Sequence, residues 1–231
     1  MNPTEWFGSV VQDKDDLIQV AKTTKTVLFD NLSISATEDV IMYLYYHTFN
    51  SILEILKSKQ KDYDEYVINI ADRLKIGYTN ITDESAEKQG NFQFKMQHMN
   101  LEAHDEPLNE DEKKTLTLCV QWNASNIKEQ TELLKDISIR TYETLKAEGF
   151  MLESYELVIP IFAMTHKNLV KYAELKFIDS GEDEYSINVL SLYDILITRD
   201  EDNNIIVSYP AQFDTKHAIK SDVDSEDLDE D

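Results

Sequence analysis

Glycine, proline and cysteine are scarce in this chain, and each shortage excludes a class of protein. The 231 residues include 5 glycines and 4 prolines, far below the average usage of roughly 7% and 5%. The glycines stand too far apart for a Walker loop or a dinucleotide-binding fingerprint, which both need closely spaced glycines. The single cysteine, Cys119, cannot form an intrachain disulfide. The sequence therefore argues against nucleotide hydrolysis, Rossmann chemistry and a disulfide-stabilised fold.

Long apolar runs are also missing. No run approaches the ~20 residues that cross a bilayer, and the first residues, MNPTEWFGSVVQDKDD, lack the basic start and apolar core of a secretion signal. We therefore expect a cytoplasmic protein without a membrane-spanning role. The composition, rich in Asn, Ile, Lys, Asp and Tyr, is typical of an AT-rich phage or bacterial gene. If a phage encodes the chain, the host cytoplasm or the virion is the expected location.

Basic residues are few compared with acidic ones. Against 45 Asp and Glu there are 22 Lys and Arg, which gives a formal net charge of −23. This charge repels phosphate backbones and anionic membrane surfaces, and it attracts cationic surfaces. Direct nucleic-acid binding is therefore not expected, whereas a protein partner with a basic surface is. The alternative explanation is that the charge only maintains solubility.

The acidic excess is strongest at the C-terminus. The last eleven residues, SDVDSEDLDED, contain seven carboxylates and no lysine or arginine. From about residue 213 onward the chain is polar and then acidic, so we expect residues 213–231 to form a flexible tail. The candidate interaction residues in this tail are Asp222, Asp224, Glu226, Asp227, Asp229 and Glu230.

Residues 1–80 are expected to form a helical region. Residues 4–25 are a weak, interrupted helix candidate, and the next helix is predicted more clearly because Ser35 and Glu38 have the spacing of a capping box. From Val40 to Leu56 the apolar side chains surround most of the helix, which indicates burial on several sides or contact with another subunit. Burial is the favoured interpretation. The alternative makes three aromatic side chains candidate interface residues: Tyr43, Tyr46 and Phe49.

Three- and four-residue spacing of apolar side chains between Tyr63 and Leu74 predicts a further helix that ends near Gly77. After residue 90 the pattern alternates instead. Residues 92–98 and 115–122 each alternate between apolar and polar side chains, which predicts an antiparallel hairpin. Residues 125–149 form the best isolated helix candidate, with a cap at Ser125 or Asn126 and a stop at Gly149.

Four strand-like runs complete the folded part. They cover residues 154–164, 169–179, 184–199 and 204–210, separated by turn compositions. Pro160 within the first run indicates an edge strand or a bulge. Residues 90–212 are therefore expected to form an α+β domain, in which one long helix packs on a face of a mainly antiparallel sheet.

Candidate catalytic and metal sites are weak. His98 and His104, near Glu102, Asp105 and Glu106, do not have a recognised zinc spacing, and no second His or Cys cluster completes them. Cys119 lies in a strand pattern without the glycine-rich turn that exposes a nucleophile. We therefore expect no catalytic site, no metal and no cofactor.

Two functions from different classes remain. The first is a non-enzymatic assembly or adaptor protein that binds a protein partner and forms homo-oligomers. The second is an acidic inhibitor that mimics nucleic acid and occupies the cationic groove of a polymerase or a defence nuclease. Many of the acidic residues lie in the tail and in the 101–112 loop, while residues 126–140 mix both signs of charge. This distribution favours the first function.

Overall fold

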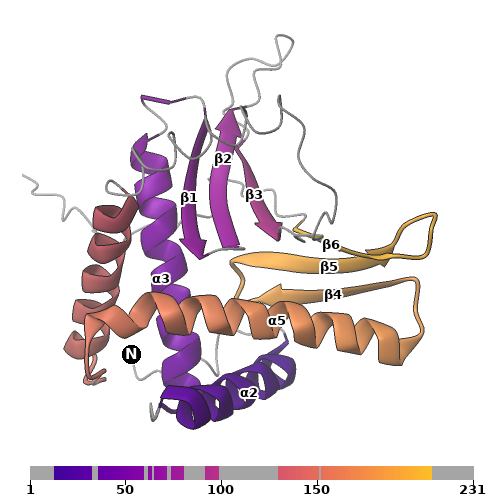
Figure 1. Ribbon diagram of the computed structural model, residues 1–231, viewed down its shortest axis with the longest axis horizontal. Helices are drawn as coiled ribbons and strands as arrows, with labels where there is room; N and C mark the ends of the chain where they lie inside the picture. The colour runs from indigo at the N-terminus through magenta and orange to yellow at the C-terminus, as the bar shows by residue number, and fades with distance from the viewer. Residues whose placement is uncertain are drawn as a thin grey trace, which may run out of the picture.

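A computed structural model describes residues 13–32, 36–59, 62–63, 65–71, 74–80, 92–98, 130–150 and 152–209. This part of the chain combines helices with two antiparallel three-stranded sheets (Figure 1). The expected α+β class, with helices first and a long helix against a sheet, is confirmed. Residues 115–122 and 213–231, where a strand and a flexible tail were predicted, lie outside the described residues.

Two helices open the described chain, α2 (Lys14–Leu32) and α3 (Glu38–Lys59). The prediction of a helix from Ser35 was correct in type but early in its start. The Thr37 hydroxyl accepts the amide of Val40 at 3.4 Å, so Thr37 caps α3 and Glu38 is its first residue. The Glu38 carboxylate instead accepts a hydrogen bond from Lys25 of α2 at 3.3 Å. Ser35 lies outside the described residues.

The prediction of a helix between Tyr63 and Gly77 is wrong, because this segment forms two strands. They are β1 (Glu65–Ala71) and β2 (Leu74–Asn80), which pair antiparallel. Ile68, Ile70 and Ile76 point to the core and are buried. These β-branched side chains favour a strand, and their alternation outweighs the weaker helical spacing. The third strand, β3 (Phe92–His98), was predicted and pairs with β2.

The prediction of two strands at residues 154–164 and 169–179 is also wrong. A short 3₁₀ turn, η1 (Tyr155–Leu157), leads into one long helix, α5 (Val158–Ser180). Pro160 therefore marks neither an edge strand nor a bulge. It is the third residue of α5, where the missing amide hydrogen costs nothing because the first-turn amides have no partner within the helix. The THKN segment, expected to be a turn, lies in the middle of α5.

The second sheet consists of β4 (Glu184–Val189), β5 (Tyr193–Arg199) and β6 (Ile205–Ser208). The predicted single strand over residues 184–199 is two strands joined by a tight turn. Leu190 and Ser191 have positive φ angles of 55° and 57°, which mirror-image hairpin turns require. Neither residue is Gly or Asn, so the usual signal for this turn is missing. Leu190 is buried, and its packing compensates for the unfavourable backbone.

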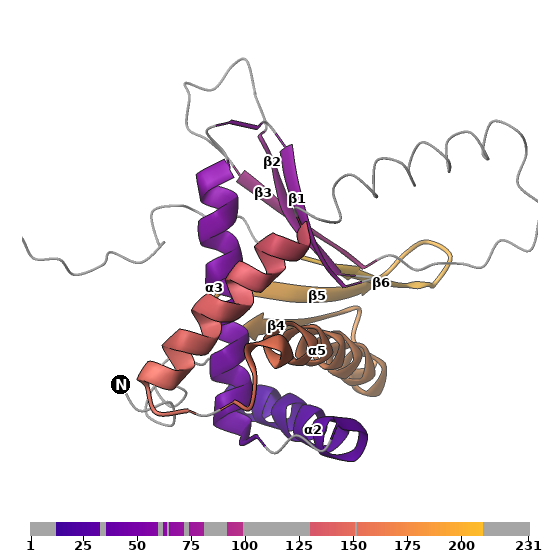
Figure 2. The same ribbon diagram turned by 60° about the vertical axis from the view of Figure 1, so that its left-hand side comes forward.

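The core joins both halves of the chain. α2, α3 and α5 contact one another, and α5 lies lengthwise against β4 and β5 (Figure 1). The helix predicted around residues 125–149 is present over residues 130–147 and lies beside α3 (Figure 2). Gln130, the first described residue of this helix, accepts a hydrogen bond from Asn69 of β1, and Phe150 beyond its end contacts Tyr43 of α3. Residues from 1–80 and from 90–212 therefore share one cluster of buried side chains.

We predict that Gly77→Ala destabilises the fold strongly. A Cβ atom at this position would lie 2.5 Å from the Tyr66 carbonyl oxygen and 2.8 Å from a Val67 methyl group. β1 would have to move, at a cost of about 3 kcal/mol. Chemical denaturation measures the change. Gly149→Ala is the control, since a Cβ there meets no atom within 4 Å and only its positive φ is unfavourable, which costs about 1 kcal/mol. Equal losses for the two variants would contradict this description of the β1–β2 contact.

Candidate functional site

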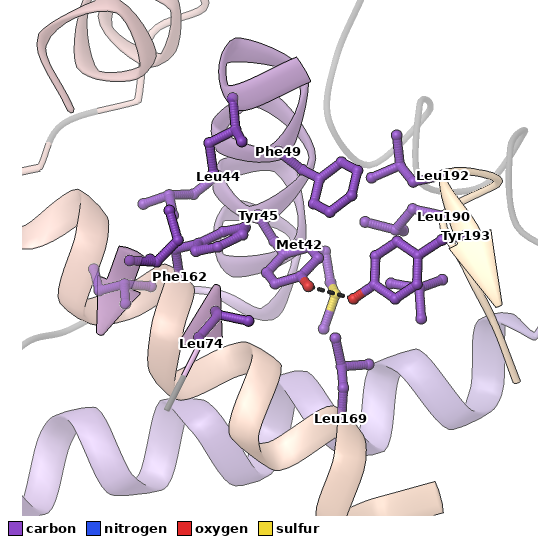
Figure 3. Close-up of a cluster of buried hydrophobic side chains, with 14 of the residues drawn as sticks. Met42, Leu44, Tyr45, Phe49, Leu74, Phe162, Leu169, Leu190, Leu192 and Tyr193 are labelled. Carbon is purple, nitrogen blue, oxygen red and sulfur yellow. Dashed lines mark hydrogen bonds between the residues drawn. The ribbon is translucent and has the colours of Figure 1, made fainter. Parts of the chain in front are cut away.

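Four side chains capable of acid–base chemistry meet inside the protein. The Tyr45 hydroxyl lies 3.0 Å from His166 Nδ1 and forms a short hydrogen bond with the Tyr193 hydroxyl, drawn in Figure 3. His166 Nδ1 is also 3.2 Å from the Tyr193 hydroxyl, and His166 Nε2 is 3.2 Å from the Tyr209 hydroxyl. We call these four residues the Tyr–His cluster.

Each member of the Tyr–His cluster comes from a different segment. Tyr45 lies on α3, His166 on α5, Tyr193 at the start of β5 and Tyr209 directly after β6. Ring contacts surround the hydroxyls: Tyr45 stacks on Phe162 at 4.6 Å between centroids, and Tyr193 stacks on Phe49 at 5.0 Å. The cluster therefore joins four segments of the chain at one point.

One tautomer of His166 satisfies the cluster. With the proton on Nε2, the imidazole donates to Tyr209, and Nδ1 accepts from one of the two inner tyrosines. The other inner tyrosine then donates to its neighbour's oxygen. Every buried polar atom of Tyr45, Tyr193 and His166 then has a partner, as a low-dielectric interior demands.

Burial governs the ionisation of these tyrosines. It raises the pKa of Tyr45 and of Tyr193 far above the usual range, and it raises the pKa of Tyr209, helped by the negative charge of Glu174. Such phenols stay neutral at any physiological pH. Tyr45, Tyr193 and His166 are also almost completely buried. The arrangement therefore acts as a cross-link between elements and does not present a nucleophile or base to a substrate.

A second polar contact connects α2 to α5 and β4. Asp16 accepts hydrogen bonds from Tyr172 at 2.5 Å and from Tyr185 at 3.2 Å. Burial and the Asp16 charge together raise the pKa of Tyr185 to about 12. Asp13 accepts the backbone amide of Asn188 at 2.7 Å. Asp16 and Asp13 therefore link the start of the described chain to α5 and β4.

A group of acidic side chains lies at one end of the second sheet. β4 begins beside the end of β5, since Glu184 pairs with Thr198. The turn between α5 and β4 and the turn between β5 and β6 therefore lie at the same end, on the right in Figure 1. We call this region the acidic end, and its carboxylates are Asp179, Glu182, Asp183, Glu184, Asp200, Glu201 and Asp202.

The acidic end is electrostatically unfavourable for α5. A helix C-terminus carries partial negative charge, which Lys or Arg in the last turn normally offsets. The last turn of α5 has no basic residue and contains Asp179, with Glu182 and Asp183 just beyond it. Arg199 at this end lies over the Phe177 ring, with 5.0 Å to the centroid, and donates to the Asn203 carbonyl. The negative charges at this end therefore destabilise the C-terminus of α5.

The residues predicted as interaction sites lie in different places. Tyr43 and Phe49 are buried in the core, and Tyr46 is partly exposed on α3. The carboxylates from Asp222 to Glu230 lie outside the described residues, as do His104, its acidic neighbours and Cys119. No group of three metal-binding side chains occurs in the described ranges.

Sequence reasoning missed the Tyr–His cluster. His166 was assigned to a turn because residues 154–179 were interpreted as strands. A helical signal was present: the buried positions Val158, Ile161, Phe162, Thr165, His166, Leu169 and Ala173 recur at three- and four-residue spacing. No comparable signal in the sequence pairs Tyr45 with Tyr193, which lie 148 residues apart.

Comparisons with known proteins identify no relative: no family model, no curated protein and no solved structure matches this chain. Among the helices that the structure describes, none is both long and apolar enough to span a membrane.

We predict that Tyr45→Phe destabilises the protein by about 1 to 2 kcal/mol, because it removes the buried hydrogen bonds that the Tyr45 hydroxyl forms with His166 and with Tyr193. Urea denaturation measures the loss. Tyr63→Phe is the matched control, since Tyr63 is 49% exposed, and its effect is expected within about 0.5 kcal/mol. A Tyr45→Phe variant as stable as the wild type would contradict the description of the Tyr–His cluster as a structural cross-link.

Proposed function

We propose that this protein is a non-enzymatic interaction protein that binds a basic partner protein through its acidic end. The observation that carries the proposal is the convergence of two turns, from α5 to β4 and from β5 to β6, which gathers exposed carboxylates at one end of the second sheet. Complementary charge of this kind speeds association and selects partners.

The interior of the fold supports a binding role over catalysis. The described residues that most resemble catalytic groups, His166 and its tyrosine partners, are used as a buried cross-link. Active sites combine such groups with an accessible surface, so that a substrate can reach them. Here the accessible surface carries charge, which suits recognition of another macromolecule.

A second candidate is the nucleic-acid mimic. The observation that favours it is the grouping of carboxylates at the acidic end, since a mimic needs several negative charges close together on its surface. Under this alternative the partner is a nucleic-acid enzyme, and added DNA competes for the same cationic groove.

The test is affinity capture from lysate of the natural host with salt elution, comparing two variants that each lose four negative charges. The first changes the acidic end, and the second changes exposed carboxylates elsewhere. The substitutions are Glu182→Gln, Asp183→Asn, Glu201→Gln and Asp202→Asn in the first, and Asp30→Asn, Glu132→Gln, Glu143→Gln and Glu153→Gln in the second. Asp200 is left intact because it accepts two hydrogen bonds from Asn204, at 2.7 and 3.0 Å.

We expect the wild type and the second variant to retain a basic protein that the first variant loses. The same loss from both variants would mean that only net charge matters, and no capture of a basic protein by the wild type would refute the proposed function. Release of the captured protein by added DNA would favour the mimic over the adaptor.

A further inference from the structure

The surface of α5 next to the acidic end carries two exposed apolar side chains. Leu175 is 50% and Ile178 is 51% exposed. They stand three residues apart, so they lie on the same face of the helix. The opposite face of α5 is buried through Ala173 and Phe177. Leu175 and Ile178 therefore belong to the outer side of a helix whose inner side already fills the core.

The charges around this apolar pair are arranged along the helix. Asp179, Glu182 and Asp183 lie at its C-terminal side, and Lys171 lies one turn toward the N-terminus. Lys176, between the two apolar residues in the sequence, lies 4.0 Å from Asp16 of α2. We propose that Leu175 and Ile178, flanked by the acidic end, form a docking site for a basic amphipathic helix of a partner protein. This inference rests on the proposed function and names the surface and the chemistry of its partner.

Two features point to a basic occupant. Apolar side chains at the centre of a charged rim are typical of interfaces, where the rim selects the partner and the centre provides affinity. The C-terminus of α5 also lacks the basic residue that would normally offset its partial negative charge. Lysine or arginine side chains of a docked helix would supply that compensation.

Charge argues against other occupants. The C-terminal residues 221–231 of this chain carry seven carboxylates and no basic residue, so the acidic end would repel them. A second copy of the chain brings a formal charge of −23, which also opposes close approach at this surface.

The test uses a short synthetic peptide of leucine and lysine, with leucines three and four residues apart so that they form one helical face. Binding is measured by fluorescence anisotropy to the full chain, to a Leu175→Ser/Ile178→Ser variant and to a control variant. The control, Phe29→Ser/Ile139→Ser, removes two exposed apolar side chains on other helices, of which Phe29 is 62% exposed. A scrambled peptide of the same composition tests for binding by charge alone.

We expect the wild type and the control variant to bind the amphipathic peptide equally, and the Leu175→Ser/Ile178→Ser variant to bind it about tenfold more weakly or worse. Equal binding by all three proteins, or equal binding of the scrambled peptide, would overturn the inference. A wild-type dimer in light scattering that the Leu175→Ser/Ile178→Ser variant loses would also overturn it, in favour of a second copy.

The captured natural partner separates this inference from the proposed function. If the Leu175→Ser/Ile178→Ser variant retains the basic protein that the wild type captures, the docking site is wrong and the proposed function stands. If the wild type captures no basic protein, the proposed function fails whatever the peptide shows.

Discussion

The fold depends on covering one helix that is apolar around its circumference. Five consecutive residues of α3, from Ile41 to Tyr45, are buried, and successive helical residues point about 100° apart. No single neighbour can cover all of these directions. α2, α5, the helix over residues 130–147 and the β1–β2 hairpin therefore surround α3, and segments far apart in the sequence become neighbours. Burial of each large apolar side chain contributes roughly 1.5 to 3 kcal/mol, so the enclosure of α3 contributes substantially to the stability of the fold.

Polar groups enter this interior only where the fold satisfies them. The hydroxyls of Tyr45 and Tyr193 form hydrogen bonds with each other and with His166. Asp16 accepts hydrogen bonds from the hydroxyls of Tyr172 and Tyr185. Hydrogen bonds are directional, whereas apolar contacts are not, so these groups fix how α3, α5 and β5 meet. Tyr45, Tyr193 and His166 are also buried, so their polar atoms are not exposed to a substrate. The charges of the acidic end differ from these buried groups, because they lie at the surface and destabilise the C-terminus of α5.

Sequence patterns predicted the elements whose period was unambiguous and failed where two periods overlapped. The helix around residues 130–147, α3 and β3 followed directly from their spacing. The β1–β2 segment and α5 each combine alternation with three- and four-residue spacing, and the choice depended on contacts that the local sequence does not contain. The β4–β5 turn was not predicted, because its positive φ angles occur at Leu190 and Ser191 and not at Gly or Asn. The Tyr–His cluster could not be predicted, because it joins residues that only the tertiary fold brings together, and the acidic end likewise needed the register of β4 and β5.

Interior and surface therefore have different roles in our proposal: the buried ionisable groups hold the fold together, and the acidic end with Leu175 and Ile178 is the proposed binding surface. Hydrogen–deuterium exchange of the full chain, alone and with the leucine–lysine peptide, tests these roles most directly. The account predicts slow exchange in α3 under both conditions and new protection confined to the last turn of α5 and the turn between β5 and β6. Protection that appears instead on α2 or on the helix over residues 130–147, or no change with the peptide, would contradict it.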